Sequence, residues 1–228
     1  MTHEGKIEID GEEYARLMRE NAKQRECITE LQRDMTNMQE RHRLDRVGGI
    51  LTGKAIEMAV MRGDIEITPF KKEHINPASI DLTLGRYYTM YQPLLLNACY
   101  DVKAEIPSHR RTIPDEGLIL TPGELYLMHT EERVATKHFV SVLDGKSSIG
   151  RLGICVHLTA GYGDVGFDGQ YTLEMTSVFR MRIYAGMKIA QMRFHTVAGE
   201  RTSYQNTGKY VGEFASGPVP SMAWKQFR

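Results

Sequence analysis

The first regular pattern of apolar positions runs from Glu12 to about Arg46, a stretch that contains many charges and neither proline nor glycine. Apolar residues recur there at alternating spacings of three and four, which is the heptad pattern of a coiled-coil helix. Asn21 and Gln24 interrupt the seam. The pattern predicts a long helix and favours self-association, with a single helix packed on the body of the protein as the alternative. The seam positions are Tyr14, Leu17, Asn21, Gln24, Ile28, Leu31, Met35 and Met38.

A shorter helix is expected after the glycine pair at positions 48 and 49. Thr52 can cap its N-terminus, and we expect Ile56, Val60 and Met61 to share its apolar face. A strand should follow this helix directly.

From about residue 75 the pattern changes to strand-sized apolar runs, separated at short intervals by Gly, Pro, Asn and Asp. This spacing is typical of an all-β barrel or sandwich. We therefore expect a helical extension over residues 1–47, a mainly β domain over 48–203, and a C-terminal flap and tail over 204–228. The tail lacks the periodicity of a core element, so it is either a disordered end or a flap that orders over a ligand.

The composition is that of an ordinary globular protein. Lys and Arg together number 29, as do Asp and Glu, so the charge indicates neither a nucleic-acid nor an anionic-membrane partner. Three widely separated cysteines form no C-x-x-C pair, which fits a reducing compartment and argues against disulfides or a cysteine zinc site. We find neither a signal peptide nor a run of eighteen apolar residues, and expect a cytoplasmic protein.

The stretch GYGDVG, residues 161–166, fits the G-x-G-x-x-G pattern of dinucleotide-binding loops. That pattern requires a strand before it and a helix after it, whereas residues 170–175 alternate as a strand does. Asp164 also stands where backbone N–H groups would meet phosphate. We therefore predict a glycine-rich β-hairpin instead of an NAD site, with glycines that allow close approach of the backbone to another group.

Two segments concentrate groups suited to chemistry. Lys146, Ser147, Ser148 and Arg151 offer two cations and two hydroxyls after a glycine, which suits phosphate oxygens, although an ordinary surface turn can have the same composition. Glu174 lies in the predicted strand, where the alternation allows it to face either solvent or a pocket. In a pocket near cations, its carboxylate could act as a general acid and base for an attacking water.

The histidines form no convincing constellation. Residues 129–131, HTE, match the first half of the zinc deaminase signature, but no P-C-x-x-C follows anywhere in the chain. A zinc hydrolase is therefore not expected, and no metal-ligating residues are assigned.

Several longer motifs occur in a fixed order between about Ile50 and Ser221. They are INPASIDLTLG, TPGELYL, LDGKSSIGRLGICVHLTAGYGDVGFDGQYTLEM, AGMKIAQMRF and GKY…G…GPVPS. In these motifs the sequence resembles the dCTP deaminase family of the trimeric dUTPase-like superfamily. The resemblance implies a homotrimer of distorted dUTPase-like β barrels with active sites at subunit interfaces. It also implies a deoxycytidine nucleotide substrate and Mg²⁺ held by the triphosphate and water, without zinc.

The resemblance also implies roles for individual residues. Glu174 would accept and donate the proton of the water that attacks C4 of cytosine, while Arg151 and Ser147 would orient that water and stabilise charge at the reacting carbon. Asp164 would meet the 3′-hydroxyl of the deoxyribose. The implied nucleotide-binding residues are Lys146, Ser147, Ser148, Ile149, Gly150, Arg151, Asp164, Thr172, Leu173, Glu174, Gln191, Tyr204, Lys209 and Glu213.

The implied reaction is deamination of dCTP to dUTP in pyrimidine deoxynucleotide metabolism. SSIGRLG together with TAGYGD resembles the members that also hydrolyse dUTP to dUMP and diphosphate, in which Asp164 would help to activate a second water. The tail departs from the family, because Glu213 stands where a base-reading glutamine is usual. The alternatives are a dUTP diphosphatase only, and a non-catalytic nucleotide-binding module that uses the helical extension to reach a partner.

Overall fold

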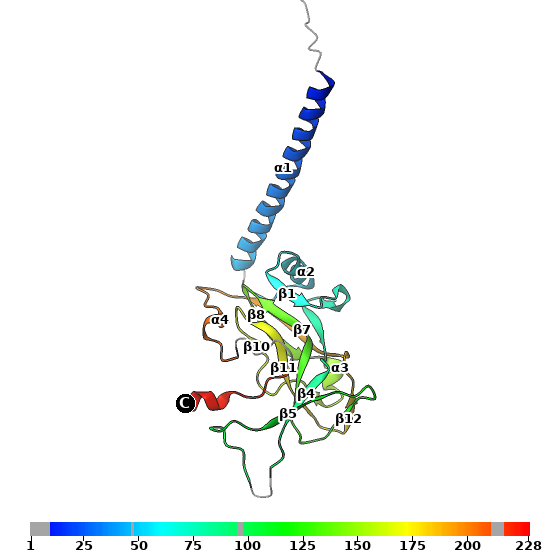
Figure 1. Cartoon of the computed structure of the whole chain (residues 1–228), viewed down its shortest axis with the longest axis vertical. Coiled ribbons are helices and arrows are strands. Elements are labelled where there is room, and N and C mark those ends of the chain that lie inside the picture. The colour runs from blue at the N-terminus through cyan, green and yellow to red at the C-terminus, as the bar shows by residue number, and fades with distance from the viewer. Residues whose placement is uncertain (1–9, 47, 95–97, 211–216) are drawn as a thin grey trace, which may run out of the picture. The chain divides into compact units, whose positions relative to one another are not determined.

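The computed structural model describes residues 10–46, 48–94, 98–210 and 217–228, and the chain divides into two units, Met1–Val47 and Gly48–Arg228. The first unit contains one long helix, α1 (Gly11–Arg46), drawn in blue in Figure 1. Glu12 and Glu13 lie in its first turn, where the positive end of the helix dipole stabilises carboxylates. The long helix predicted from the heptad spacing is confirmed.

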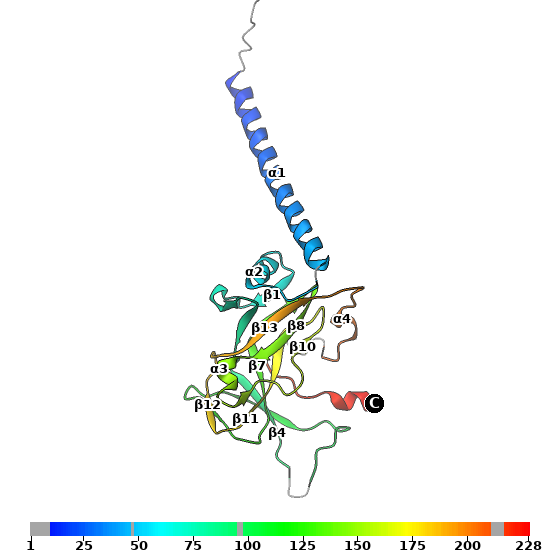
Figure 2. The same cartoon turned by 180° about the vertical axis from the view of Figure 1, so that it is seen from behind.

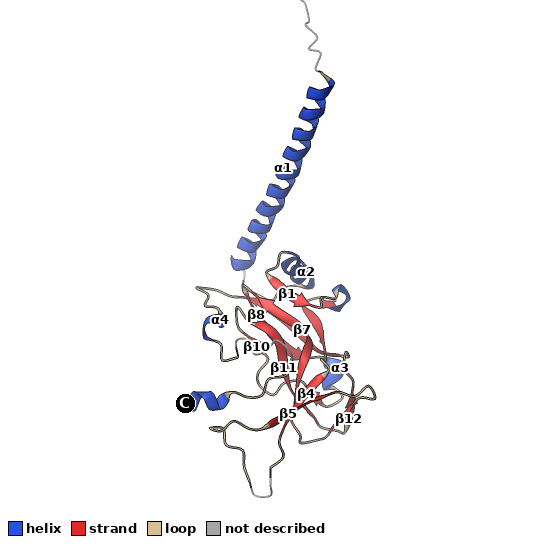
Figure 3. Cartoon of the chain, viewed as in Figure 1, coloured by secondary structure: helices blue, strands red, loops and turns tan. Residues whose placement is uncertain are grey.

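The second unit consists mainly of antiparallel strands, shown in red in Figure 3. A six-stranded sheet has the order β5-β4-β7-β11-β9, with β1 paired to β7, and a five-stranded sheet has the order β10-β8-β13-β3-β2; β12 pairs with β6. The strands are β1 (Ile65–Thr68), β2 (Ile75–Asn76), β3 (Ser79–Thr83), β4 (Tyr87–Tyr91), β5 (Ser108–Thr112), β6 (Leu118–Leu120), β7 (Tyr126–Thr136), β8 (Phe139–Gly145), β9 (Ile154–Cys155), β10 (Tyr162–Gly163), β11 (Asp168–Ser177), β12 (Met181–Ile183) and β13 (Lys188–Thr196).

The predicted mainly β class is confirmed, and the barrel is distorted to the extent that the described strands form separate sheets instead of one closed barrel. Buried side chains come from both large sheets, with Leu173 and Met175 of β11 and Phe194 of β13 all 0% exposed. The predicted alternation in β11 is present, because its buried and half-buried residues alternate without exception. This alternation fixes the face of β11 on which each side chain lies.

Short helices connect the strands. Thr52 caps α2 (Gly53–Met61) as predicted, its side chain accepting a hydrogen bond from the Ala55 N–H at 3.3 Å. The buried face of α2 is formed by Ile56 and Ala59, however, and Met61 is 70% exposed. The prediction for Met61 was wrong because a residue five positions after Ile56 lies about 140° further around the helix. The other short helices described are η1 (Lys72–His74), α3 (Ser147–Gly150), α4 (Tyr204–Thr207) and η2 (Ala223–Phe227).

The predicted hairpin around residues 161–166 is absent from the pairing of the described strands. β10 pairs with β8 in the five-stranded sheet, whereas β11 pairs with β7 and β9 in the other large sheet; Figure 2 shows β13, β8 and β10 side by side. The loop therefore crosses between sheets. Glycine is required at Gly163 because an added Cβ would lie 1.9 Å from the Tyr171 hydroxyl oxygen, and Gly166 has a φ of +84°.

The described parts of the C-terminal tail are ordered against the β domain. The Val219 N–H donates to the Thr172 hydroxyl at 3.1 Å, and the Ser221 N–H donates to the Tyr91 hydroxyl at 3.0 Å. Of the two expectations for the tail, these contacts agree with the flap. In the described residues, no helix combines the length and the apolar character needed to cross a membrane.

Candidate active site

A cavity of about 490 Å³ lies beside β11, within the size range of small-molecule sites. Four residues predicted from the sequence line it: Asp164, Thr172, Glu174 and Tyr204. The C-terminal segment contributes Val219 to the same cavity. The other lining residues are Tyr91, Leu125, Leu127, Leu158, Thr159, Ala160, Tyr162, Phe167, Tyr171, Tyr210 and Ser221.

Glu174 reaches the cavity because of the pleat of β11. Leu173 and Met175 point into the core, so Glu174 shares the opposite face with Thr172, and both are half-buried. One carboxylate oxygen of Glu174 accepts a hydrogen bond from the Leu158 N–H at 3.0 Å. This bond orients the carboxylate at the edge of the cavity. Of the two orientations that the alternation allowed, the structure has the one that lines a pocket.

Tyrosines form much of the remaining wall. The Tyr171 hydroxyl is hydrogen-bonded to the Ser141 hydroxyl, and burial raises the pKa of Tyr171 far above its ordinary value. Burial also raises the pKa of Tyr91 and of Tyr204. The Phe167 ring lies 4.4 Å from the Tyr171 ring, centroid to centroid. At neutral pH these phenols are therefore uncharged and offer a flat, apolar wall with hydroxyl groups that can donate or accept hydrogen bonds.

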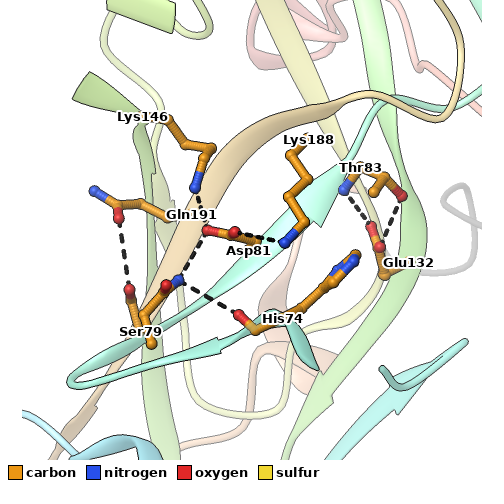
Figure 4. A network of polar contacts seen from close by, with 9 residues as sticks. His74, Ser79, Asp81, Thr83, Glu132, Lys146, Lys188 and Gln191 are labelled. Carbon is orange, nitrogen blue, oxygen red and sulfur yellow. Dashed lines mark hydrogen bonds and ion pairs between the residues drawn. The ribbon is translucent and has the colours of Figure 1, made fainter. Parts of the chain in front are cut away.

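A second group of predicted residues lies at α3 and the strands beside it. Lys146 forms an ion pair with the buried Asp81, whose other oxygen lies 3.2 Å from Lys188 Nζ (Figure 4). Burial by itself would raise the pKa of Asp81, but the hydrogen bonds from Lys146, Asn76 and Lys188 and the charge of Lys146 outweigh it, so the pKa is lowered. Asp81 is therefore ionised at neutral pH and holds two ammonium groups together.

The remaining predicted residues differ in their accessibility. The side chains of Ser147, Ser148 and Arg151 are exposed, whereas Ile149 is buried and anchors α3 to the domain. Gln191 Nε2 donates to the Gly145 carbonyl at 3.2 Å, and Gln191 Oε1 accepts a hydrogen bond from the Ser79 hydroxyl at 3.5 Å (Figure 4). The Leu173 side chain is buried, so only its main chain could contact a base.

The structure thus brings the predicted residues together in two groups within one chain. The cavity group is Asp164, Thr172, Glu174 and Tyr204, and the second group comprises Lys146 to Arg151 with Gln191, none of which lines this cavity. Lys209 is exposed just after α4 and belongs to neither group. Glu213 lies outside the described residues.

Sequence reasoning did not single out Asp81 or Tyr91 as functional residues. Asp81 has a sequence signal, because it stands between Ile80 and Leu82 in a strand where nearly every residue is buried. A charge at such a position requires a partner. Tyr91 has no comparable signal.

Comparison with known proteins identifies the family of the chain. A family model described as dCTP deaminase-like matches residues 50–197, which is more than half of the chain. The chain belongs to this family. It is 42% identical over 178 residues to "dCTP deaminase, dUMP-forming" of Hathewaya histolytica. This match covers 78% of this chain and 99% of that protein. The protein of the same name from Leptospira biflexa is 43% identical over 178 residues, with 78% and 98% covered.

Among solved structures, the fold is similar to that of the 2′-deoxycytidine 5′-triphosphate deaminase from Agrobacterium tumefaciens, with a TM-score of 0.52 and 23% sequence identity. The match covers 66% of this chain and 49% of that chain, so this chain spans about half of its length. This likeness supports the dCTP deaminase-like fold. The whole of α1 precedes the part of the chain that the family model matches.

Proposed function

We propose that this protein hydrolytically deaminates dCTP and hydrolyses the resulting dUTP to dUMP and diphosphate. The observation that carries the proposal is the position of Glu174, a carboxylate oriented by the Leu158 N–H at the edge of a cavity large enough for a nucleoside. Relatives matched over nearly their whole length are named "dCTP deaminase, dUMP-forming", which favours the two-step reaction over a diphosphatase alone.

In the deamination step, the Glu174 carboxylate takes a proton from a water as that water attacks C4 of cytosine. It then returns a proton to the departing amino group, which leaves as ammonia. The tyrosine-lined wall gives the base and sugar a flat apolar surface. The exposed Arg151 and Ser147 orient the water and stabilise the charge that develops at the reacting carbon.

Arg151 and Ser147 are not among the residues that line the cavity of their own chain. We therefore infer that a neighbouring subunit supplies them, and that the working form is a homotrimer with its sites between subunits. Their exposure on α3 supports this, because exposed side chains can project into the cavity of another copy.

In the second step Asp164 helps to activate a water against the α-phosphate. Asp164 lines the same cavity as Glu174, so one bound nucleotide can undergo both reactions without leaving. The bond between the α-phosphorus and the bridging oxygen breaks, and diphosphate leaves.

Mg²⁺ bound through the triphosphate would supply charge neutralisation on the phosphate oxygens. The ammonium groups of Lys146 and Lys188 fit the triphosphate and not the cation, so phosphate oxygens and water would hold Mg²⁺ there. Lys146 would hold the triphosphate, and Asp81 would hold Lys146 in place.

The test is incubation of the purified protein with dCTP and Mg²⁺, followed by separation of dUTP, dUMP, ammonia and diphosphate. Equal amounts of ammonia, dUMP and diphosphate are expected. Accumulation of dUTP would reduce the proposal to deamination alone. Conversion of added dUTP without any release of ammonia from dCTP would favour a dUTP diphosphatase. Nucleotide binding without turnover would favour a non-catalytic module.

A further inference from the structure

The apolar seam of α1 is exposed along its described length. Its apolar side chains are Tyr14, Leu17, Ile28, Leu31, Met35 and Met38, with between 44% and 67% of their surface accessible. A helix of 36 residues is about 54 Å long, and such a stripe in water favours a partner. The relatives are matched over 98% to 99% of their length by 78% of this chain. The seam is therefore an addition to the common enzyme.

The heptad register assigns the seam residues. Positions 14, 21, 28 and 35 are a positions, and positions 17, 24, 31 and 38 are d positions. Asn21 then lies in an a layer and Gln24 in the neighbouring d layer. A buried amide is satisfied when it meets another amide. Both layers achieve this when identical copies lie parallel and in register, or when they lie antiparallel with Asn21 opposite Gln24 of the other copy.

The flanking charges give an independent argument for orientation. The g positions carry Glu13, Glu20, Cys27 and Asp34, and the e position after Glu20 carries Arg25. Antiparallel helices place g beside g, which in the register that pairs Asn21 with Gln24 brings Glu13 beside Asp34 of the other copy. Parallel helices place g beside the following e of the partner, which pairs Glu20 with Arg25.

We propose that the seam is covered by α1 of a second copy of this chain, in a parallel, in-register coiled coil. The amide layers set the register, and the Glu20–Arg25 pair together with repulsion between Glu13 and Asp34 in the alternative favours the parallel orientation. This proposal does not depend on the proposed reaction, because it uses only residues of α1.

Disulfide trapping in the full-length protein tests the proposal. The three exposed native cysteines, at positions 27, 99 and 155, are first replaced by serine. Leu17→Cys then places a thiol at a d position, and Arg19→Cys places one at the f position two residues later, on the outer face. Circular dichroism of both variants checks that helix content is unchanged.

Under mild oxidation at low micromolar concentration, Leu17→Cys should form a disulfide-linked dimer at least about tenfold faster than Arg19→Cys, because only d-position thiols face each other at bonding distance. Equal rates would overturn the proposal, since they would mean that the β domain merely holds loose helices near one another. Absence of both products would also overturn it and would favour a different partner. A mixture of Leu17→Cys and Ile28→Cys chains that joins faster than Leu17→Cys alone would indicate the antiparallel coil in which Asn21 meets Gln24, and would overturn the orientation.

Discussion

The two groups of candidate residues in the β domain differ in the kind of ligand that each could hold. The cavity beside β11 is lined by tyrosines, apolar side chains and two carboxylates, Asp164 and Glu174. The cluster around Asp81 holds the ammonium groups of Lys146 and Lys188. The first suits a base and a sugar, and the second suits phosphates. A nucleoside triphosphate needs both, and the separation within one chain is what makes a site shared between subunits the natural proposal.

The largest effect is expected from Glu174→Gln, which keeps the shape of the side chain and removes the base. Loss of a positioned general base costs about 10² to 10⁴ in rate, so ammonia release from dCTP should fall by that factor. Binding of dCTP should persist, as measured by calorimetry. The matched control is Glu131→Gln, which changes an exposed carboxylate on the neighbouring strand β7. This variant should keep the turnover of the wild-type protein. If the turnover of Glu174→Gln lies within threefold of wild type, Glu174 is not the general base.

Mixing two inactive variants tests whether the two groups belong to one chain or to two. Glu174→Gln and Arg151→Ala chains are unfolded together, mixed equally and refolded. If each site takes Glu174 from one chain and Arg151 from another, about a quarter of the sites in a random cyclic assembly combine two intact residues. Deamination should therefore recover to about a quarter of the wild-type rate. If the refolded mixture recovers no deamination activity, both residues belong to the site of a single chain.

The wall of the cavity can be disturbed without touching a proposed catalytic group. Gly163→Ala would place its Cβ 1.9 Å from the Tyr171 hydroxyl and 2.5 Å from the Ser141 hydroxyl. Overpacking of this kind costs about 1–3 kcal/mol of the free energy of unfolding, measured by denaturant titration. Gly150→Ala, which meets nothing within 4 Å, should change stability little. Equal stability of the two variants would contradict the packing argument for this loop.

The sequence predicted the local elements well and the pairing of strands less well. Heptad spacing is enough to predict the helix α1, and the alternation around Glu174 is enough to predict the strand β11, because each pattern lies within one continuous segment. β10 consists of only Tyr162 and Gly163, and nothing local indicates that it pairs with β8 across the domain. The position of β10 is constrained by the close approach of Gly163 to the Tyr171 side chain, which depends on packing between the two sheets.

The candidate site shows the same division. The resemblance to a family placed Asp164, Thr172, Glu174 and Tyr204 in one set with ten further residues, and among the described residues the cavity brings together only these four. The alternation alone could not say whether Glu174 faces solvent or a pocket, because the cavity is completed by the tail at Val219 and Ser221. A tail without periodicity gives no signal of where it will lie.

The smallest expected effect concerns pH and the cluster around Asp81. Because the pKa of Asp81 is lowered in the folded protein, its ionised form contributes stability that is fully present above its unfolded pKa and is lost as the pH falls through the lower folded value. Asp81→Asn lacks this contribution, so its deficit in free energy of unfolding should be largest near pH 6 and should shrink below about pH 4. We expect a change of about 1 kcal/mol or less, because Lys188 remains partly in water. Urea titrations of both proteins across this range measure it. A deficit that stays constant down to the acid limit would mean that Asp81 stabilises the domain through its shape and hydrogen bonds, and that its charge does not hold the lysines.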